Sequence, residues 1–304
     1  MRASPYYAQA ELLVRYLPAL GAADCFAIKG GTAINLFVRE LPRLSVDIDL
    51  VFTPLIERAQ ALQEMSEALE RVGERAEKLV PRLRVTATGA ADAPKQIAAT
   101  SSAQIKIEPN PVLRGTAFYP EKRRLSAAAE EFFEMSATAT VASVPDLYAG
   151  KLCAALDRGH PRDWFDVMPL LKPGAIDDRL RQAFVVYLAS HNRPMAELLE
   201  PQPNPLGDLF AREFAGMPRE PVTIQEIEST QATLPAILRS SLSEAERRFL
   251  LSIKLGEPEW DLLPIPHLRE LPALSWKLNN VEALKRNRDK YADSVARLRR
   301  VLEL

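Results

Sequence analysis

The chain has few of the side chains that build disulfide frameworks and transition-metal sites. Its 304 residues include 2 cysteines and 3 histidines. Cys25 and Cys153 are too few for a disulfide scaffold, and a structural zinc site needs about four ligands. The histidines, His160, His191 and His267, lie far apart in the sequence. A metal site built on histidine or cysteine is therefore not expected.

The chain also lacks an excess of charge of either sign and any long apolar run. It carries 39 basic and 40 acidic residues, a formal net charge of −1. A globally polyanionic partner is not indicated, and contact with nucleic acid would need a local basic patch. No stretch approaches the roughly 18 apolar residues of a membrane span, and residues 1–7 lack a signal core. We expect a cytoplasmic protein that does not associate with membranes.

What the chain does contain is a mixed pattern of strands and helices in its first 172 residues. Residues 25–28 and 46–52 have the apolar or alternating patterns of strands. Thr53 and Pro54 predict the N-cap and first turn of a long helix that continues to about Lys78. Other expected elements are helices at residues 6–17, 33–38, 144–157 and 162–171, and strands near residues 82–88, 103–107 and 133–141.

The second part of the chain has no alternating strands and is typical of helices. Residues 176–200 and 206–304 follow this pattern, and Ser243 with Glu246 forms a capping box ahead of an apolar run. The length also suits two domains better than one very large core. We therefore predict an α/β (α+β) fold, with a mixed-sheet domain over residues 1–172 and a helical domain over residues 173–304.

Two acids on one strand, with a glycine turn before them, carry the candidate chemistry. Asp47 and Asp49 are two positions apart, so both carboxylates project from one face of the strand. Such paired oxygen ligands suit Mg²⁺ (or Mn²⁺), which proteins bind through carboxylates and substrate phosphates. Gly30, Gly31 and Thr32 lie between a strand and a helix, where backbone N–H groups can approach a triphosphate closely.

Each motif alone has an ordinary structural explanation. Two glycines after a strand often form only a tight turn, and Asp-x-Asp occurs by chance in exposed strands. Their occurrence together and in this order favours a nucleotide site with a divalent metal. Ser45 shares the acid-bearing face, where a hydroxyl usually bonds only to backbone or solvent. A regulatory alternative is that a phosphate on Ser45 would block triphosphate binding through its negative charge.

The arrangement resembles a known family of enzymes. Residues 28–32 followed by residues 43–50 resemble the signature of DNA-polymerase-β-like nucleotidyltransferases. More closely, they resemble the AbiEii/AbiGii (MenT-like) toxin family of bacterial abortive-infection and toxin–antitoxin systems. The resemblance extends to that family's Lys…Arg…Arg-Asp-x-x-Asp block and to later segments, at residues 150–158, 161–167, 256–260 and 271–279.

The resemblance implies a polymerase-β-like nucleotidyltransferase domain and a set of residue roles. Asp47 and Asp49 would be catalytic metal ligands, and Lys151 would contact the triphosphate or neutralise its charge during transfer. Asp166 would be a further essential acid. Polymerase-β-like sites usually have a third carboxylate on a neighbouring strand, and Glu108 is the candidate here. The expected nucleotide-binding residues are Lys29, Gly30, Gly31, Thr32, Ser45, Arg158 and Asp163.

Several of these charges have a simpler alternative. Lys151, Arg158, Asp163 and Asp166 could be helix-surface charges, with Arg162 and Asp166 as an ion pair one turn apart. An exposed face of lysine and glutamate would likewise explain Glu108. The last 20 residues are rich in lysine and arginine, which usually indicates a solvated helix and otherwise an RNA-backbone contact.

The expected function is that of a toxin in a toxin–antitoxin or phage-defence pair. It would transfer NMP from an NTP to an acceptor, with release of pyrophosphate, and the acceptor would be RNA such as tRNA. A cognate antitoxin is the expected protein partner. Two rivals are a small-molecule (antibiotic-type) nucleotidyltransferase and a catalytically silent nucleotide-binding module.

Overall fold

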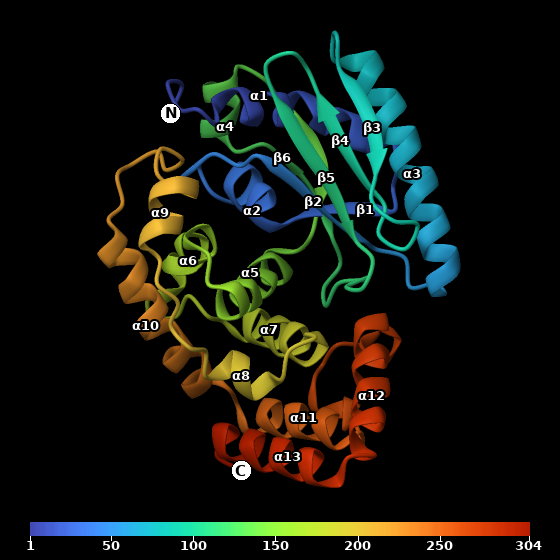
Figure 1. Cartoon of the computed structure of the whole chain (residues 1–304), viewed down its shortest axis with the longest axis vertical. Helices are drawn as coiled ribbons and strands as arrows, with labels where there is room; N and C mark the ends of the chain where they lie inside the picture. The colour runs from blue at the N-terminus through green and yellow to red at the C-terminus, as the bar shows by residue number, and fades with distance from the viewer. The chain divides into compact units, whose positions relative to one another are not determined.

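A computed structural model describes residues 1–304 (Figure 1). The chain divides into two compact units, each made of two segments. Unit 1 comprises Met1–Leu147 and Glu213–Val222, and unit 2 comprises Tyr148–Arg212 and Thr223–Leu304. None of the helices combines the length and apolar character needed to cross a bilayer.

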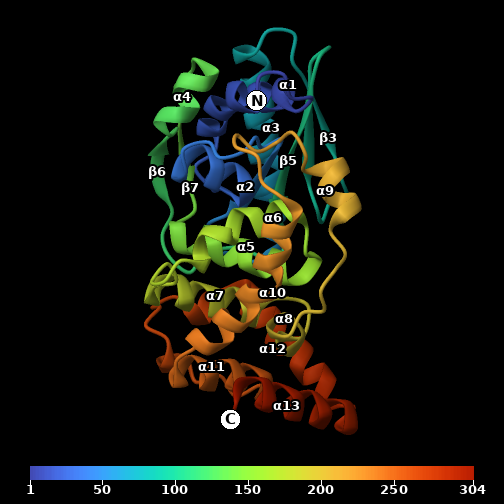
Figure 2. The same cartoon turned by 90° about the vertical axis from the view of Figure 1, so that its left-hand side faces the viewer.

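Unit 1 is built on a mixed sheet of seven strands in the order β3-β4-β5-β2-β1-β7-β6. The central strands β2 and β5 run parallel, as do β1 and β7, whereas the other neighbours are antiparallel. Figure 2 shows β6 and β7 at the side of the sheet away from β3. The strands are β1 (Phe26–Lys29), β2 (Asp47–Phe52), β3 (Arg84–Thr88), β4 (Lys95–Ala99), β5 (Gln104–Asn110), β6 (Glu121–Arg124) and β7 (Thr138–Val141).

The two faces of this sheet differ in character. Along β2, Ile48 and Leu50 are fully buried, whereas Asp47 and Asp49 between them are half-buried. Three helical elements pack on the apolar face: α1 (Tyr7–Tyr16), η1 (Leu17–Ala22) and α3 (Arg58–Leu79). Buried Gln96 of β4 fixes two of them, because its amide accepts from the Tyr16 hydroxyl (3.1 Å) and donates to the Leu69 carbonyl (2.7 Å). The other face carries the acids.

The predicted start of the long helix was wrong by several residues. Thr53 does not cap it, because its backbone N–H and its hydroxyl both donate to the Cys25 carbonyl, at 2.9 and 3.2 Å. This contact extends the pairing of β1 with β2 beyond Phe52. The helix α3 begins at Arg58, with Glu57 as the N-cap residue. Pro54 therefore lies in a connection and not in the first helical turn.

Three elements of unit 1 were missed or displaced in the sequence analysis. Strands β4 and β6 were not predicted, and the strand expected near residues 133–141 is confined to β7. The residues before β7 form α4 (Ala127–Phe133), which Ser126 caps and which Glu134 ends in a left-handed conformation, φ 55°. The helix expected at 33–38 starts earlier, as α2 (Gly30–Ala33) continued by η2 (Ile34–Val38).

Unit 2 is helical, as the sequence predicts. The capping box of Ser243 and Glu246 is present, and a second one joins Thr223 and Glu226. Glu246 also accepts two hydrogen bonds from Arg181 of α7, at 2.9 and 2.7 Å. The helices are α5 (Val144–Arg158), α6 (Pro161–Val167), η3 (Met168–Leu171), α7 (Asp178–Ser190), α8 (Met195–Leu199), α9 (Gly207–Glu213), α10 (Ile224–Ser241), α11 (Glu244–Leu255), η4 (Trp260–Leu262), η5 (Leu268–Glu270), α12 (Pro272–Lys285) and α13 (Arg288–Leu302).

The division of the chain differs from the boundary expected after residue 172. It falls inside α5, between Leu147 and Tyr148, because α6 and η3 pack against α10 of unit 2. In addition, Glu213–Val222 returns to unit 1 from the middle of the helical part. The mixed α/β fold itself is confirmed.

Candidate active site

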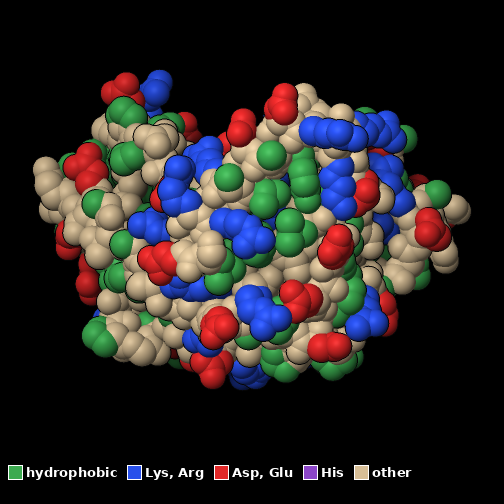
Figure 3. Space-filling model, turned by 90° about the horizontal axis from the view of Figure 1, so that it is seen from below, with side chains coloured by type: hydrophobic (Ala, Val, Ile, Leu, Met, Phe, Trp, Pro, Cys, Tyr) green, Lys and Arg blue, Asp and Glu red, His purple; other side chains and the backbone are tan.

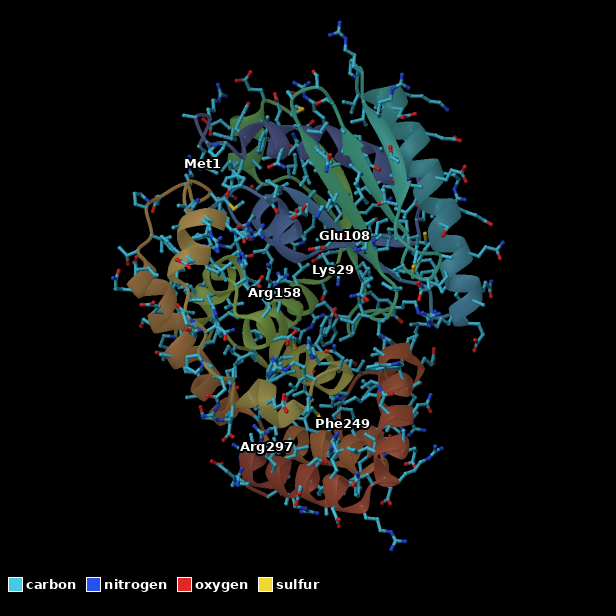
Figure 4. All side chains as sticks on the ribbon, viewed as in Figure 1. Met1, Lys29, Glu108, Arg158, Phe249 and Arg297 are labelled. Atoms are coloured by element: carbon cyan, nitrogen blue, oxygen red, sulfur yellow. The ribbon has the colours of Figure 1, made fainter.

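The acid-bearing face of unit 1 gathers charged side chains from three adjacent strands. In the strand register, Asp49 of β2 lies opposite Lys29 on one side and Glu108 on the other, and Asp47 lies opposite Lys106. Residues opposite each other in adjacent strands share a face, with Cβ atoms about 5 Å apart. Figure 4 shows Lys29 and Glu108 close together on the sheet, one on each side of β2. Lysines therefore flank the two aspartates and reduce their mutual repulsion.

Gly30 brings the backbone directly against the carboxylate of Asp49. A Cβ added at Gly30 would lie 2.5 Å from Asp49 Oδ2, and Gly30 has a φ of 70°. Any side chain at this position would both displace the carboxylate and adopt a left-handed conformation. The glycine turn predicted from the sequence is therefore a close approach of the chain to the acidic pair.

Thr32 joins the glycine turn to the acid strand from the inside. Its side chain is 1% exposed, and its hydroxyl bonds to Ser45 Oγ (2.8 Å) and to the Asp47 carbonyl. Asn35, also buried, donates to the Gly31 carbonyl at 2.7 Å. The hydroxyls of Thr32 and Ser45 are thus used within the protein and fix Asp47 relative to the turn. Their contact with a nucleotide stays a prediction.

Ser45 is 8% exposed, and its hydroxyl points to Thr32. A kinase could phosphorylate this residue only after residues around 45 opened locally. The regulatory alternative for Ser45 therefore requires a conformational step that the folded structure does not offer.

The two aspartates suit a hard divalent cation, whereas the third predicted ligand is engaged elsewhere. Both are half-buried on one face, in contact with a glycine that leaves room beside Asp49. Glu108 lies next to Asp49 in register, but its carboxylate forms an ion pair with Lys95, 2.7 Å from Nζ to Oε1. No three acidic, histidine or cysteine side chains are grouped so that they could hold a metal ion. Glu108 would have to leave Lys95 to join the pair.

Unit 2 contains the second set of predicted residues, and it brings all four together. Lys151 Nζ lies 2.7 Å from Asp163 Oδ1 and 3.0 Å from Asp166 Oδ2. Arg158 makes a two-pronged contact with the same Asp163 carboxylate, at 2.6 Å from Nε and 3.0 Å from Nη2. We call these four residues the Lys151 cluster. Figure 4 labels Arg158 on α5.

Local sequence explains why these four side chains meet. Lys151 and Arg158 are seven residues apart on α5, two helical turns, so they share one face. Gly159, with a φ of 63°, ends that helix, and Pro161 starts α6 in its first turn. On α6, Asp163 and Asp166 are one turn apart and point the same way.

The Lys151 cluster is buried, which excludes the alternative of helix-surface charges. Asp163 and Asp166 are 0% exposed and Lys151 is 7% exposed. Burial by itself raises the pKa of Asp163, but the charge of Lys151 and the hydrogen bond and charge of Arg158 outweigh it. The pKa of Asp163 therefore lies well below its usual range. Two buried carboxylates balance two cations, as a stable buried ionic group requires.

Comparison with known proteins identifies the family. A model of the family described as "Nucleotidyl transferase AbiEii toxin, Type IV TA system" matches residues 11–280. The chain belongs to this family. It is a toxin nucleotidyltransferase, and the predicted resemblance is confirmed.

The fold is similar to that of a solved structure in the same functional class. MenT4, a nucleotidyltransferase toxin from Mycobacterium tuberculosis H37Rv, matches with a TM-score of 0.60 at 15% sequence identity. The match covers 91% of this chain and 93% of that chain. At this low identity the likeness shows a shared fold. A comparison of the sequence with curated proteins gave no match.

Proposed function

We propose that this AbiEii toxin transfers NMP from an NTP to an acceptor hydroxyl and that the transfer depends on Mg²⁺ or Mn²⁺. The observation that carries the proposal is the contact of Gly30 with the Asp49 carboxylate, at a strand whose two aspartates share one face. A backbone with no side chain beside paired carboxylates suits a phosphate chain that must reach metal ligands.

The acid strand would supply the metal ligands. Asp47 and Asp49 would hold the cation, which when bound neutralises charge on the phosphate that is transferred. Thr32 fixes Asp47 through its carbonyl, so the position of this ligand depends on a buried hydroxyl and not on a mobile loop. Phosphoryl transfer needs positioning and charge neutralisation more than covalent chemistry, so rigid ligands are the main requirement.

The Lys151 cluster would supply positive charge for the triphosphate. Asp163 and Asp166 keep Lys151 in place and favour its protonated form. Arg158 is anchored at the same carboxylate, yet its side chain remains 62% exposed. Arg158 is therefore the member of the cluster that solvent and an anion reach most easily. In this assignment Asp163 and Asp166 are positioning residues.

For the acceptor, we propose RNA, such as a tRNA end. The toxin family supports an essential cellular target, and α13 offers exposed basic residues such as Arg288, Lys290, Arg299 and Arg300. Figure 3, which faces the helices at the C-terminal end, shows basic side chains interspersed with acidic ones and no continuous basic patch. Any RNA contact there would be local. A cognate antitoxin encoded with the toxin is the proposed partner.

Labelled nucleotides test both the reaction and the acceptor. The purified protein would be incubated with each α-³²P-labelled NTP, Mg²⁺ and one of three acceptor pools: total RNA, total protein or aminoglycosides. We expect label in RNA only with wild type, and none with Asp47→Asn. Asp92→Asn removes an exposed acid away from the site and serves as the matched control, with full transfer.

Each other result has a clear meaning. Label in aminoglycosides and not in RNA would favour the small-molecule rival, and label in protein would replace the RNA acceptor. Equal transfer by wild type and Asp47→Asn would remove Asp47 from the reaction. Transfer that persists in excess EDTA would refute the dependence on a divalent metal.

A further inference from the structure

One segment of unit 1 comes from a distant part of the chain. Glu213–Val222 connects α9 to α10, both of which lie largely in unit 2, but it packs with unit 1. We call Glu213–Val222 the strap. The chain therefore leaves the helical unit, contributes ten residues to the sheet unit and returns.

The strap pairs with the segment that leads into the acid strand. The Leu44 N–H donates to the Met217 carbonyl at 3.0 Å, and the Arg219 N–H donates to the Pro42 carbonyl at 2.8 Å. Between these two bonds, Arg43 and Pro218 form an antiparallel bridge. These contacts make a short two-stranded ladder across more than 170 positions of sequence.

Buried side chains and a third polar contact hold the strap in place. Phe214 and Met217 are 0% and 1% exposed, so both ends of its tight turn are embedded in unit 1. Between them Gly216 has a φ of 82°, and its carbonyl accepts from the Ser4 hydroxyl at 2.7 Å. The strap is thus a well-anchored element with a specific conformation.

The ladder ends just where the acid strand begins. Sheet pairing of β2 starts at Asp47, with Lys106 of β5, so residues 42–46 precede the sheet. Within this stretch the strap holds residues 42 and 44, and Thr32 holds Ser45 and the Asp47 carbonyl. An extended chain advances about 3.3 Å per residue, so Leu44 lies only about 10 Å from Asp47.

We propose that the strap is a positioning element of the active site: by pairing with residues 42–44 it fixes Ser45 and Asp47 for catalysis. The proposal rests on the proposed role of Asp47 in nucleotidyl transfer. Misplacement of a reacting group by about 1 Å can cost roughly a hundredfold in rate, so loosening this segment affects kcat far more than KM. The strap residues touch neither substrate nor metal in this assignment.

The first experiment removes one backbone hydrogen bond. Arg219→Pro deletes the N–H that donates to Pro42, while the Arg219 side chain is exposed and makes no part of the contact. Pro218 precedes it and already lies in an extended bridge, the backbone that a following proline requires. Arg219→Ala keeps the N–H and is the matched control. Hydrogen exchange of residues 42–47, kcat, KM for the NTP and the melting temperature are measured for both.

We expect exchange at residues 42–47 to be about tenfold faster in Arg219→Pro, in line with the loss of one buried hydrogen bond. The same variant should lose roughly tenfold to a hundredfold in kcat with a nearly unchanged KM. Arg219→Ala should behave as wild type in every measurement. Unchanged exchange in Arg219→Pro, or faster exchange with unchanged kcat, would overturn the proposal.

A milder pair of variants applies if Arg219→Pro does not fold. Gly216→Ala places a side chain at a φ of 82°, with only ordinary contact to Ser4 Oγ at 3.8 Å. Gly174→Ala imposes the same kind of backbone strain, at a φ of 77° with open space around it, in unit 2. Similar losses in melting temperature are expected, but only Gly216→Ala should speed exchange at residues 42–47 and lower kcat. Equal kcat values for the two variants would overturn the proposal.

These experiments also separate the strap from the proposed function. If wild type transfers no nucleotide, the proposed reaction fails, and the exchange measurements still report whether the strap fixes residues 42–47. If wild type is active and the strap variants match their controls, the strap proposal alone fails.

Discussion

The acid strand and the Lys151 cluster both contain paired aspartates, but their surroundings give these acids opposite properties. Asp47 and Asp49 are half-buried, and Asp49 faces the bare backbone of Gly30. Asp163 and Asp166 are fully buried, and both already contact Lys151. A carboxylate with open coordination can take a ligand, whereas a saturated, buried one can only hold its partner. The comparison assigns ligand binding to the first pair and positioning to the second.

Exchanging one acid in each pair for its amide would produce the largest effects and separates activity from stability. Asp49→Asn should reduce transfer by about a thousandfold, because several kcal/mol of metal stabilisation are lost, while stability stays nearly constant. Asp163→Asn should cost about 3–5 kcal/mol of unfolding free energy, since it leaves Lys151 and Arg158 with an uncompensated buried charge. Urea unfolding and labelled-NTP assays measure both quantities. Equal stability losses in the two variants would contradict the comparison.

Gly30→Ala would sharpen the first half of the comparison. The new Cβ would lie 2.5 Å from Asp49 Oδ2, and the residue would be held at a φ of 70°. Backbone strain of this kind costs about 1–2 kcal/mol, and the carboxylate must also move. We expect transfer to fall by about a hundredfold, because a shift of about 1 Å is enough for such a loss. Transfer close to wild type, measured beside Gly174→Ala, would show that the close approach is not needed.

The sequence predicted the local parts of both sites well, because their signals are local. The alternation of Asp47, Ile48 and Asp49 fixes one acidic face of a strand, and Pro161 marks the start of α6. What it did not predict depends on distant partners. Thr53 looks like a helix cap, but the Cys25 carbonyl, 28 residues earlier, takes its hydroxyl.

The burial of the Lys151 cluster was equally hidden in the sequence. Charges spaced one turn apart on a helix usually lie at the surface. Their burial here is decided by the packing of α6 and η3 against α10, more than 50 residues later. The strap is the extreme case, since no periodicity in residues 213–222 indicates pairing with residues 42–44. Sequence reasoning found the residues that carry chemistry and missed most of those that hold them.

Acid should weaken the second region selectively. The pKa of Asp163 is lowered in the folded protein because Lys151 and Arg158 outweigh the effect of burial. A lowered folded pKa means that the stabilisation is complete above the unfolded value, about 3.9, and is lost as pH falls below it. The stability difference between wild type and Asp163→Asn should therefore be constant from pH 5 to 7, and it should shrink below about pH 4. Unfolding free energies from urea titrations at each pH test this; a constant difference down to pH 2 would contradict it.

The smallest expected effect concerns Glu108, which lies between the two kinds of acid. It is next to Asp49 in register like a ligand, yet it is paired with Lys95 like a positioning acid. This ion pair is largely solvent-accessible, so breaking it costs less than about 1 kcal/mol. If Glu108 is a third metal ligand, Lys95→Gln frees its carboxylate and should lower the Mg²⁺ concentration for half-maximal transfer about twofold to threefold. Glu108→Gln should raise the same concentration by a larger factor. If Glu108→Gln leaves the Mg²⁺ requirement of wild type unchanged, Glu108 belongs with the structural acids, and Asp47 and Asp49 are the whole carboxylate set of the sheet.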